Sequence, residues 1–379
     1  MNQIKVVPVS DGSGLKDFLK LPWRIQKNDP CWVPPILSEQ KRMLDRKSGP
    51  FFEFGEVQLF LALRGSEPVG RISAHINHRH DEIHDSNTGF FGFFECVEDR
   101  AVSSALFDAA AEWLKARGRS RILGPESFSI YDDIGILVKG FDSLPAFLQG
   151  HNPPYYESLL LDWGFRKAID WYAIRIMAQD PNIDRAGMKK RLDRIMRGQN
   201  LVLRPPLANE LVNRAGEVCE LFNDMWSDNW GHIPLTEHQF RDIFVQLKPI
   251  MRTRAIRLLL DGNDIVGFIV NIPDINPAIQ KCNGRLYPWD MLRLLWAGRF
   301  GPVRKVRTLI MGVRRSHQRR NLHHALILSS YLENVTDRNL EVIDCSLISE
   351  PLEHLLRAIE VLFRNAERYK IFRIFEREI

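Results

Sequence analysis

Residues 308–324 have the sequence TLIMGVRRSHQRRNLHH, an apolar stretch that changes abruptly into a basic one. The pattern predicts a strand over 306–313 and a helix over 320–334. The first turn of a helix has backbone N–H groups without intrahelical partners, and the helix dipole favours negative charge there. Four arginines add positive charge at the same point: Arg314, Arg315, Arg319 and Arg320. The sequence therefore predicts an anion-binding helix start, and a basic helix start facing solvent is the alternative.

The rest of the second half predicts strands and helices around this segment. The expected strands are 201–203, 255–260, 265–271, 340–345 and 369–376, and the expected helices are 209–226 and 352–366. Asp261-Gly262-Asn263 closes a hairpin between two of these strands.

The first half predicts the same order of elements. Strands are expected at 4–9, 57–63, 69–76, 89–96, 121–125 and 165–177, and helices at 14–27 and 101–117, the second ending at Gly118. A repeated order indicates an internal structural duplication, and 379 residues favour two domains. We predict an α/β (α+β) protein with domains at 1–180 and 200–379, joined by a helical connector at 181–199.

The composition excludes a disordered chain and argues against a disulfide framework and a membrane span. Hydrophobic residues make up 45% and charged residues 26%, which is typical of globular domains. The five cysteines are dispersed without a CxxC pair, and no stretch reaches the roughly 20 apolar residues of a membrane span. We therefore expect a cytoplasmic protein without a signal peptide.

The two halves differ in charge. Residues 1–180 carry 21 Lys and Arg against 24 Asp and Glu, whereas residues 181–379 carry 31 against 23. The second half should attract anions. The candidate anions are cofactor phosphates, lipid headgroups and nucleic acid. Nucleic acid is the weaker alternative because the chain lacks a helix-turn-helix, zinc or RNP signature.

The order of elements resembles the GNAT fold of acyl-CoA N-acyltransferases, in which a mixed, mostly antiparallel sheet is flanked by helices. The resemblance implies that the edge of the strand ending in Met311, Gly312 and Val313 binds the pantetheine arm of acyl-CoA. It also implies that a loop of the pattern Arg/Gln-x-x-Gly-x-Gly/Ala holds the pyrophosphate, through Gln318, Arg319, Arg320, Asn321 and His323. The sequence departs from the pattern because Asn321 and His323 replace glycines. A catalytically idle GNAT pair that binds or regulates is therefore the alternative.

The whole chain resembles a group of bacterial tandem-GNAT proteins. The matching stretches include GFFGFFE at 89–95, NPPYY at 152–156 and WSDNWGHIPLT at 226–236. Some members of the group are similar to bacterial acyltransferases that N-acylate sphingoid bases. This similarity implies a long-chain acyl donor and a lipid amine as acceptor.

Direct acyl transfer needs a base for the amine, a donor for the oxyanion and an acid for the leaving thiolate. We expect no covalent enzyme intermediate, because no cysteine has an evident histidine partner. His232 and Asp274 are candidate bases, Glu350 is a candidate catalytic or acceptor-binding group, and Tyr331 is a candidate acid. Three of these four have a structural alternative: a turn for Asp274, together with Asn276, a first-turn acid for Glu350 and core packing for Tyr331.

Candidate acceptor-binding residues lie in both halves: Asn229, Asn276, Asp132, Asp133 and Tyr156. An acidic turn is the alternative for Asp132 and Asp133. The first-half loop at 97–103 is acidic and lacks glycine, so we expect no CoA there. We also expect no metal, because the histidines at 75–84 lack a ligand spacing.

The segment 287–300 is aromatic and basic, with Arg304, Lys305 and Arg307 close behind. Such a helix is compatible with peripheral membrane contact, with an entrance for an acyl chain, or with packing against the other domain.

Overall fold

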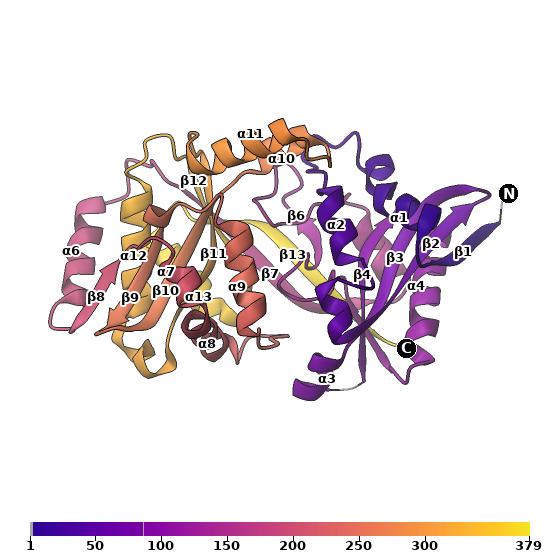
Figure 1. Cartoon of the computed structure of the whole chain (residues 1–379), viewed down its shortest axis with the longest axis horizontal. Coiled ribbons are helices and arrows are strands. Elements are labelled where there is room, and N and C mark those ends of the chain that lie inside the picture. Colours follow the sequence, from indigo (N-terminus) through magenta and orange to yellow (C-terminus); the bar gives the residue numbers. More distant parts are fainter. Residues whose placement is uncertain (1–2, 86) are drawn as a thin grey trace. The chain divides into compact units, whose positions relative to one another are not determined.

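The computed structural model describes residues 3–85 and 87–379, without the side chain of Arg319. Internal contacts divide the chain into two units, and Figure 1 labels most of their helices and strands. Unit 1 runs to Tyr172 and includes Ile279–Tyr287 and Lys370–Ile379, and unit 2 comprises Ala173–Ala278 and Pro288–Tyr369. The limits predicted from the sequence, at residues 180 and 200, stay a prediction.

Unit 1 is built on a sheet with the strand order β1-β2-β3-β4-β5-β13, in which β6 also pairs with β13. All these pairs are antiparallel except β4 with β5, which is parallel. The elements are β1 (Ile4–Val9), α1 (Gly12–Ile25), α2 (Leu37–Met43), η1 (Pro50–Glu53), β2 (Gly55–Arg64), β3 (Glu67–Asn77), α3 (His78–Ile83), β4 (Thr88–Cys96), α4 (Arg100–Lys115), β5 (Arg121–Gly124), β6 (Ile136–Lys139), α5 (Tyr156–Asp162) and the first part of β7 (Arg166–Met177).

Side-chain alternation along β2 explains why the unit 1 sheet is covered on both faces. Leu59 and Leu61 pack in one core with Phe18 of α1, whereas Phe60 and Ala62 pack in another core with Phe107 of α4. Successive strand residues point to opposite faces, so a continuously apolar strand needs a helix on each side. The helix α4 ends before Gly118, whose φ of 77° is the left-handed conformation expected of a helix stop.

Unit 2 has the strand order β12-β11-β10-β9-β8, antiparallel except for the parallel pair β11 and β12. Its elements are α6 (Arg185–Met196), β8 (Leu201–Arg204), α7 (Glu210–Asn213), α8 (Ala215–Trp226), α9 (Glu237–Leu247), η2 (Thr253–Ala255), β9 (Ile256–Asp261), β10 (Asp264–Pro273), α10 (Asn276–Cys282, which continues into unit 1), α11 (Pro288–Arg299), β11 (Lys305–Val313), η3 (Arg315–Arg320), α12 (Leu322–Asn334), β12 (Val342–Ser349), η4 (Glu350–Leu352), α13 (Glu353–Leu362) and the first part of β13 (Glu367–Glu378).

Helices cover both faces of the unit 2 sheet. Leu322 and Leu326 of α12 share a core with Val313 and with Ile195 of α6, and Figure 1 shows the two helices side by side. On the other face, α8 approaches so closely that a Cβ on Gly312 would lie 2.3 Å from the side chain of Met225. Helices therefore pack against β11 from both faces of the sheet.

Most expected elements are confirmed, including the hairpin closed at Gly262. The helix expected over 209–226 is divided into α7 and α8, and the strand expected over 340–345 continues to Ser349. The predicted α/β class with mixed, mostly antiparallel sheets flanked by helices is confirmed. Within the described residues, no helix combines the length and the apolar character needed to cross a bilayer.

Candidate active site

The parallel strands β11 and β12 separate part of the way along their length. They pair from Lys305 with Val342 to Thr308 with Cys345, although β11 continues to Val313 and β12 to Ser349. The separation begins at Leu309, an extra residue that β11 carries between two pairs with β10. A bulge bends its strand and often lies beside an active site. Beyond Thr308, the strand therefore presents backbone groups on its β12 side as an edge strand does.

The chain after β11 forms η3 and then α12, whose start is open. Asn321 precedes α12 with φ of 57°, in the left-handed region, and its side chain makes no capping hydrogen bond. Asparagine is one of the few residues besides glycine that adopts this conformation readily. Asn321 thus takes a backbone conformation that glycine also adopts without strain.

His323 lies half-buried in the first turn of α12. Burial lowers the pKa of its imidazole, and the neighbouring His324 and His354 lower it further. The side chain is therefore neutral near pH 7. It adds bulk but no charge to the helix start.

The arginines of the loop are not equivalent. The Arg315 guanidinium donates to Ser227 Oγ at 2.6 Å and pairs with Asp228 at the end of α8. Arg320 is exposed, and Gln318 Nε2 donates to Val313 O at 3.4 Å. Arg320 is consequently available to an anion at the start of α12, whereas Arg315 is occupied.

A group of charged and polar side chains lies along the paired part of β11 and β12 and just beyond it. We call it the β11 polar cluster, and its members come from β11, β12, the start of β13 and the residue after β10: Asp274, Lys305, Arg307, Asp344, Ser346 and Tyr369. Lys305 Nζ is 3.2 Å from Asp274 Oδ2, and Arg307 Nε donates to Ser346 Oγ at 3.1 Å. Ser346 and Tyr369 both donate their hydroxyl hydrogens to Asp344. Ser346 thus joins Arg307 and Asp344, and the charge of Asp344 acts on the Asp274 carboxyl.

Burial changes the acid–base properties of this cluster. Desolvation raises the pKa of the Asp274 carboxyl, and the charge of Asp344 adds to the rise, although Lys305 opposes it. Desolvation also lowers the pKa of the Arg307 guanidinium and raises that of the Tyr369 hydroxyl. A carboxyl with a raised pKa beside a lysine is a suitable proton acceptor for an amine.

Four of the predicted residues of the second half lie in two turns. Asp274 belongs to the β11 polar cluster, and its Oδ1 accepts from the backbone N of Asn276 at 3.0 Å. His232 is buried against the ring of Phe222 at 5.9 Å, and Asn229 lies half-buried in the same turn. Their predicted roles stay predictions.

The two remaining catalytic candidates lie on the helices after β11 and β12. The Tyr331 hydroxyl donates to the carbonyl of Ala178 at 3.0 Å, and its ring packs on Phe363. Glu350 is half-buried and begins η4, directly after β12. The tyrosine would have to exchange its present partner in order to protonate a thiolate.

The corresponding strand edge of unit 1 is occupied by the unit's own residues. β4 and β5 pair only as far as Phe90 with Leu123, and beyond that point Phe91 O accepts from the backbone N of Glu126 at 2.8 Å. Ser127 Oγ accepts from Phe93 N at 3.3 Å. At Cys96, Tyr156 OH accepts from the backbone N at 3.0 Å and Tyr155 OH donates to the backbone O at 2.8 Å.

The helix start that follows β4 is also occupied. Asp99 caps α4, with its Oδ1 accepting from Ala101 N at 2.8 Å. The tyrosine predicted to bind substrate, Tyr156, is buried and donates its hydroxyl hydrogen to Glu95 Oε2 at 2.6 Å. Both features leave unit 1 without an open strand edge or an open helix start at this place.

The two predicted carboxyls of unit 1 keep exposed surface although protein surrounds them. Asp132 Oδ2 accepts from Ser129 Oγ at 2.6 Å, and desolvation raises the pKa of Asp132 to about 6. Desolvation also raises the pKa of Asp133, against the charge of Arg71. A predicted role in amine binding is compatible with this placement and stays a prediction.

The cysteines are poor nucleophiles in this environment. Burial raises the pKa of Cys345 to about 12 and that of Cys219 to about 11, and it raises that of Cys96 still further. A thiol with such a pKa is protonated near pH 7 and reacts slowly. Among the described residues, no group of three or more His, Cys, Asp or Glu has the arrangement of a metal site.

Sequence reasoning missed most of the β11 polar cluster. Lys305, Arg307 and Asp344 are charged residues inside apolar central strands, and this pattern was the available signal. Tyr369 could not be connected to Asp344 from the sequence, because register across the sheet brings them together.

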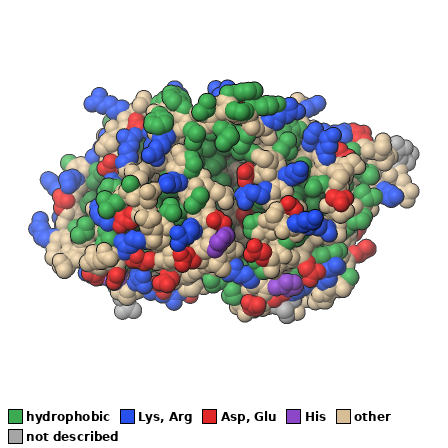
Figure 2. All heavy atoms as spheres, in the orientation of Figure 1, with side chains coloured by type: hydrophobic (Ala, Val, Ile, Leu, Met, Phe, Trp, Pro, Cys, Tyr) green, Lys and Arg blue, Asp and Glu red, His purple; other side chains and the backbone are tan. Residues whose placement is uncertain are grey.

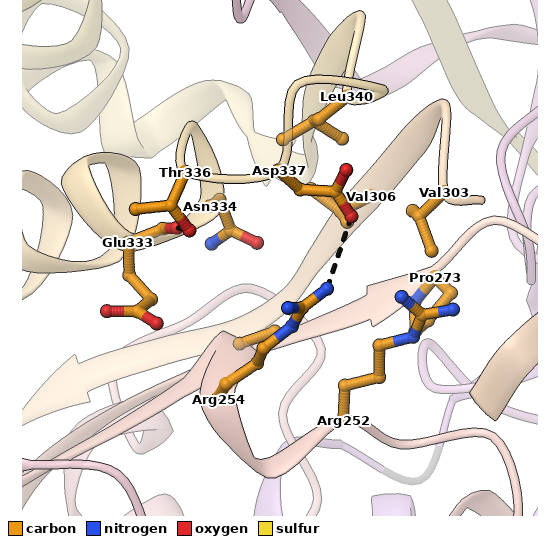
Figure 3. A pocket seen from close by; sticks show the side chains of 11 residues that line it. Arg252, Arg254, Pro273, Val303, Val306, Glu333, Asn334, Thr336, Asp337 and Leu340 are labelled. Atoms are coloured by element: carbon orange, nitrogen blue, oxygen red, sulfur yellow. Dashed lines mark hydrogen bonds and ion pairs between the residues drawn. The ribbon is translucent and has the colours of Figure 1, made fainter. Parts of the chain in front are cut away.

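A small pocket of unit 2 lies at the opposite end of α12 from its open start. Figure 3 shows it between η2, the end of β10 and the loop after α12, with Arg254 paired to Asp337 at 3.2 Å. Its lining contains none of the predicted site residues. We therefore place the candidate active site at the separated strands β11 and β12 and not at this pocket.

Comparison with known proteins identifies two close relatives in sequence. The chain is 36% identical to the bacterial ceramide synthase of Caulobacter vibrioides over 318 residues, covering 83% of this chain and 82% of that protein. It is 32% identical to Protein YghO of Escherichia coli over 368 residues, covering 96% and 93%. No family model matches the chain.

Solved structures show the same fold at low sequence identity. A tandem GNAT protein from the clavulanic acid biosynthesis pathway superimposes with a TM-score of 0.54 and 13% identity, covering 99% of this chain and 98% of the other. A GCN5-related N-acetyltransferase from Sphaerobacter thermophilus gives 0.51 and 11%, covering 98% and 95%.

Proposed function

The chain belongs to the family of tandem GNAT-fold N-acyltransferases that includes the bacterial ceramide synthase, and on that premise we propose that it moves a long-chain acyl group from acyl-CoA to a lipid amine. The amine nitrogen attacks the thioester carbonyl, the carbon–sulfur bond breaks, and an amide and free CoA result. No covalent enzyme intermediate is needed, in keeping with the protonated thiols.

We assign the donor site to unit 2, and one observation carries this assignment. The strand edge after Thr308 and the helix start after Asn321 are both open, and they follow one another along the chain. An extended thioester arm can pair with a strand edge, and a pyrophosphate suits a helix start flanked by the exposed Arg320. The remaining proposed contacts with acyl-CoA come from Met311, Gly312, Val313, Gln318, Arg319 and His323.

The lipid acceptor is proposed from the named relative. A ceramide is an amide of a long-chain amino alcohol, so a ceramide synthase acylates a lipid amine. At 36% identity over most of both chains, the same class of acceptor is the natural first choice. The identity of the acceptor varies more readily than the fold, so this part of the proposal needs its own test.

For catalysis, we propose Asp274 as the base. It combines a raised pKa with a position in the β11 polar cluster, beside Lys305 at the start of β11. The charge of Lys305 next to the Asp274 carboxyl opposes the rise in its pKa and so favours the ionised form that accepts a proton. His232 is the second candidate, and Asn229, Asn276 and Glu350 are proposed contacts with the acceptor.

Titration calorimetry with acetyl-, octanoyl- and palmitoyl-CoA tests the donor. We expect binding that tightens with chain length, because a longer chain buries more apolar surface. The absence of binding to any of the three would refute the donor site, and a preference for acetyl-CoA would refute the long-chain assignment. Release of free thiol on adding a sphingoid base, against an amino acid of similar pKa as control, then tests the acceptor class.

A further inference from the structure

Helix α11 presents its large apolar side chains to the outside. Trp289, Leu292, Trp296 and Phe300 have exposed fractions of 60%, 68%, 56% and 76%. Their spacing of three and four residues puts them on one face of the helix, and Phe300 continues the helical bonding through its N–H to Trp296 O at 2.9 Å. Leu295 borders the same face and is also exposed. The buried residues of the helix are Asp290 and Gly298, which reverses the usual pattern of a surface helix.

This presentation is held in place by specific contacts within unit 2. A Cβ on Gly298 would lie 2.6 Å from Cβ of Ile250, so the helix rests on its smallest residue. Arg252, whose side chain is labelled in Figure 3, donates to Gly298 O at 2.7 Å and to Gly301 O at 2.5 Å. Asp290 pairs with Arg293 at 3.0 Å. The apolar face is therefore part of the folded structure.

Positive charge surrounds the apolar face. Between residues 288 and 304 the single acidic residue is Asp290, which is buried, whereas Arg293, Arg299 and Arg304 are exposed. In Figure 2, hydrophobic side chains gather where Figure 1 labels α11, with Lys and Arg side chains next to them. Tryptophan and arginine together are typical of a helix lying in the headgroup layer of an anionic bilayer. A second copy of the chain fits less well, because a symmetric contact would bring like charges together.

We propose that α11 docks the protein on the surface of a phospholipid bilayer containing anionic lipids, with Trp289, Leu292, Trp296 and Phe300 in the interface and the arginines on the headgroups. This inference rests on the exposed face of α11 and not on the proposed donor or acceptor. Its consequence for the enzyme is access to substrates that are dissolved in the bilayer.

Co-sedimentation of the full chain with vesicles tests the proposal, without any thioester or amine present. We expect binding to vesicles of phosphatidylcholine with phosphatidylglycerol, and weaker binding to phosphatidylcholine alone. Leu292→Glu combined with Phe300→Glu should weaken binding at least about tenfold, since it removes apolar contact and adds repulsion.

The matched control is Leu207→Glu combined with Val361→Glu. These positions have exposed fractions of 67% and 77%, lie in the same unit and receive the same change of charge. The control should bind as the unaltered protein does. Failure of the unaltered protein to bind either vesicle, equal losses in both variants, or no loss in the α11 variant would overturn the proposal. It would also be overturned if the protein were a dimer without lipid affinity that the α11 variant converts to monomer.

Discussion

Two helix starts occupy equivalent positions in the two units, and they differ in what completes them. In unit 1, the carboxylate of Asp99 caps α4, and the backbone of β4 is bonded by residues such as Tyr155, Tyr156 and Ser127. In unit 2, α12 begins after a left-handed Asn321 without a side-chain cap, beside the separated strands β11 and β12. The same order of elements thus gives a helix start capped by the protein's own side chain in unit 1, and an uncapped helix start in unit 2. The difference lies in the local side chains and not in the topology.

The largest expected effect is on kcat, and it distinguishes Asp274 of unit 2 from Asp133 of unit 1. Asp274→Asn should lower kcat by about a hundredfold, because it removes the proposed proton acceptor. In the unaltered enzyme, kcat should fall as the pH drops through the raised pKa of Asp274, since only the ionised carboxyl accepts a proton. The variant should lose this limb of the kcat–pH profile.

Asp133→Asn in unit 1 is the matched comparison. It should leave kcat and its pH profile nearly unchanged, because the proposed proton acceptor is Asp274 and not Asp133. Equal losses of kcat in both variants would contradict the assignment of the chemistry to unit 2.

A second test compares one arginine at each helix start. Arg320→Glu should weaken binding of acyl-CoA about tenfold, equivalent to about 1.4 kcal/mol, because a negative charge replaces a positive one near the phosphates. Arg100→Glu, at the exposed start of α4, should leave the affinity unchanged. Calorimetry measures both, and an unaffected Arg320→Glu would show that the pyrophosphate lies elsewhere.

The backbone conformation of Asn321 gives a smaller and more specific effect. Valine at φ of 57° should lower the free energy of unfolding by about 1–2 kcal/mol and displace the helix start, whereas glycine adopts this conformation without strain. Asn321→Val should therefore lose affinity for acyl-CoA, and Asn321→Gly should keep it. If both variants bind alike, the left-handed residue does not shape the site.

The smallest expected effect is on stability, at the capped start of α4. Asp99→Ala should lower the free energy of unfolding by about 1 kcal/mol, because Ala101 N loses its acceptor. Denaturation in urea measures this change. Calorimetry on the same variant should give unchanged affinity for acyl-CoA, and a change would indicate that unit 1 also contributes to donor binding.

The sequence predicted the order of elements well because apolar periodicity and turn residues act locally. It placed the hairpin at Gly262 and the basic helix start after Val313, and both are confirmed. It could not show that Asn321 is left-handed, since asparagine also occurs in ordinary turns. The contacts of Tyr155 and Tyr156 with Cys96, and of Tyr369 with Asp344, join residues far apart along the chain. Such contacts depend on register across the sheet, which local pattern does not determine.

The last strand has a consequence for the order in which the protein is made. Residues 370–379 belong to unit 1, where Phe375–Glu378 pairs with β5 and Lys370 Nζ donates to Ser143 O at 2.8 Å. A ribosome therefore synthesises all of unit 2 before it releases the segment that completes the sheet of unit 1. Although its synthesis begins first, unit 1 cannot complete its sheet until the chain has passed through unit 2, because β5 pairs with residues 251 to 257 positions further along.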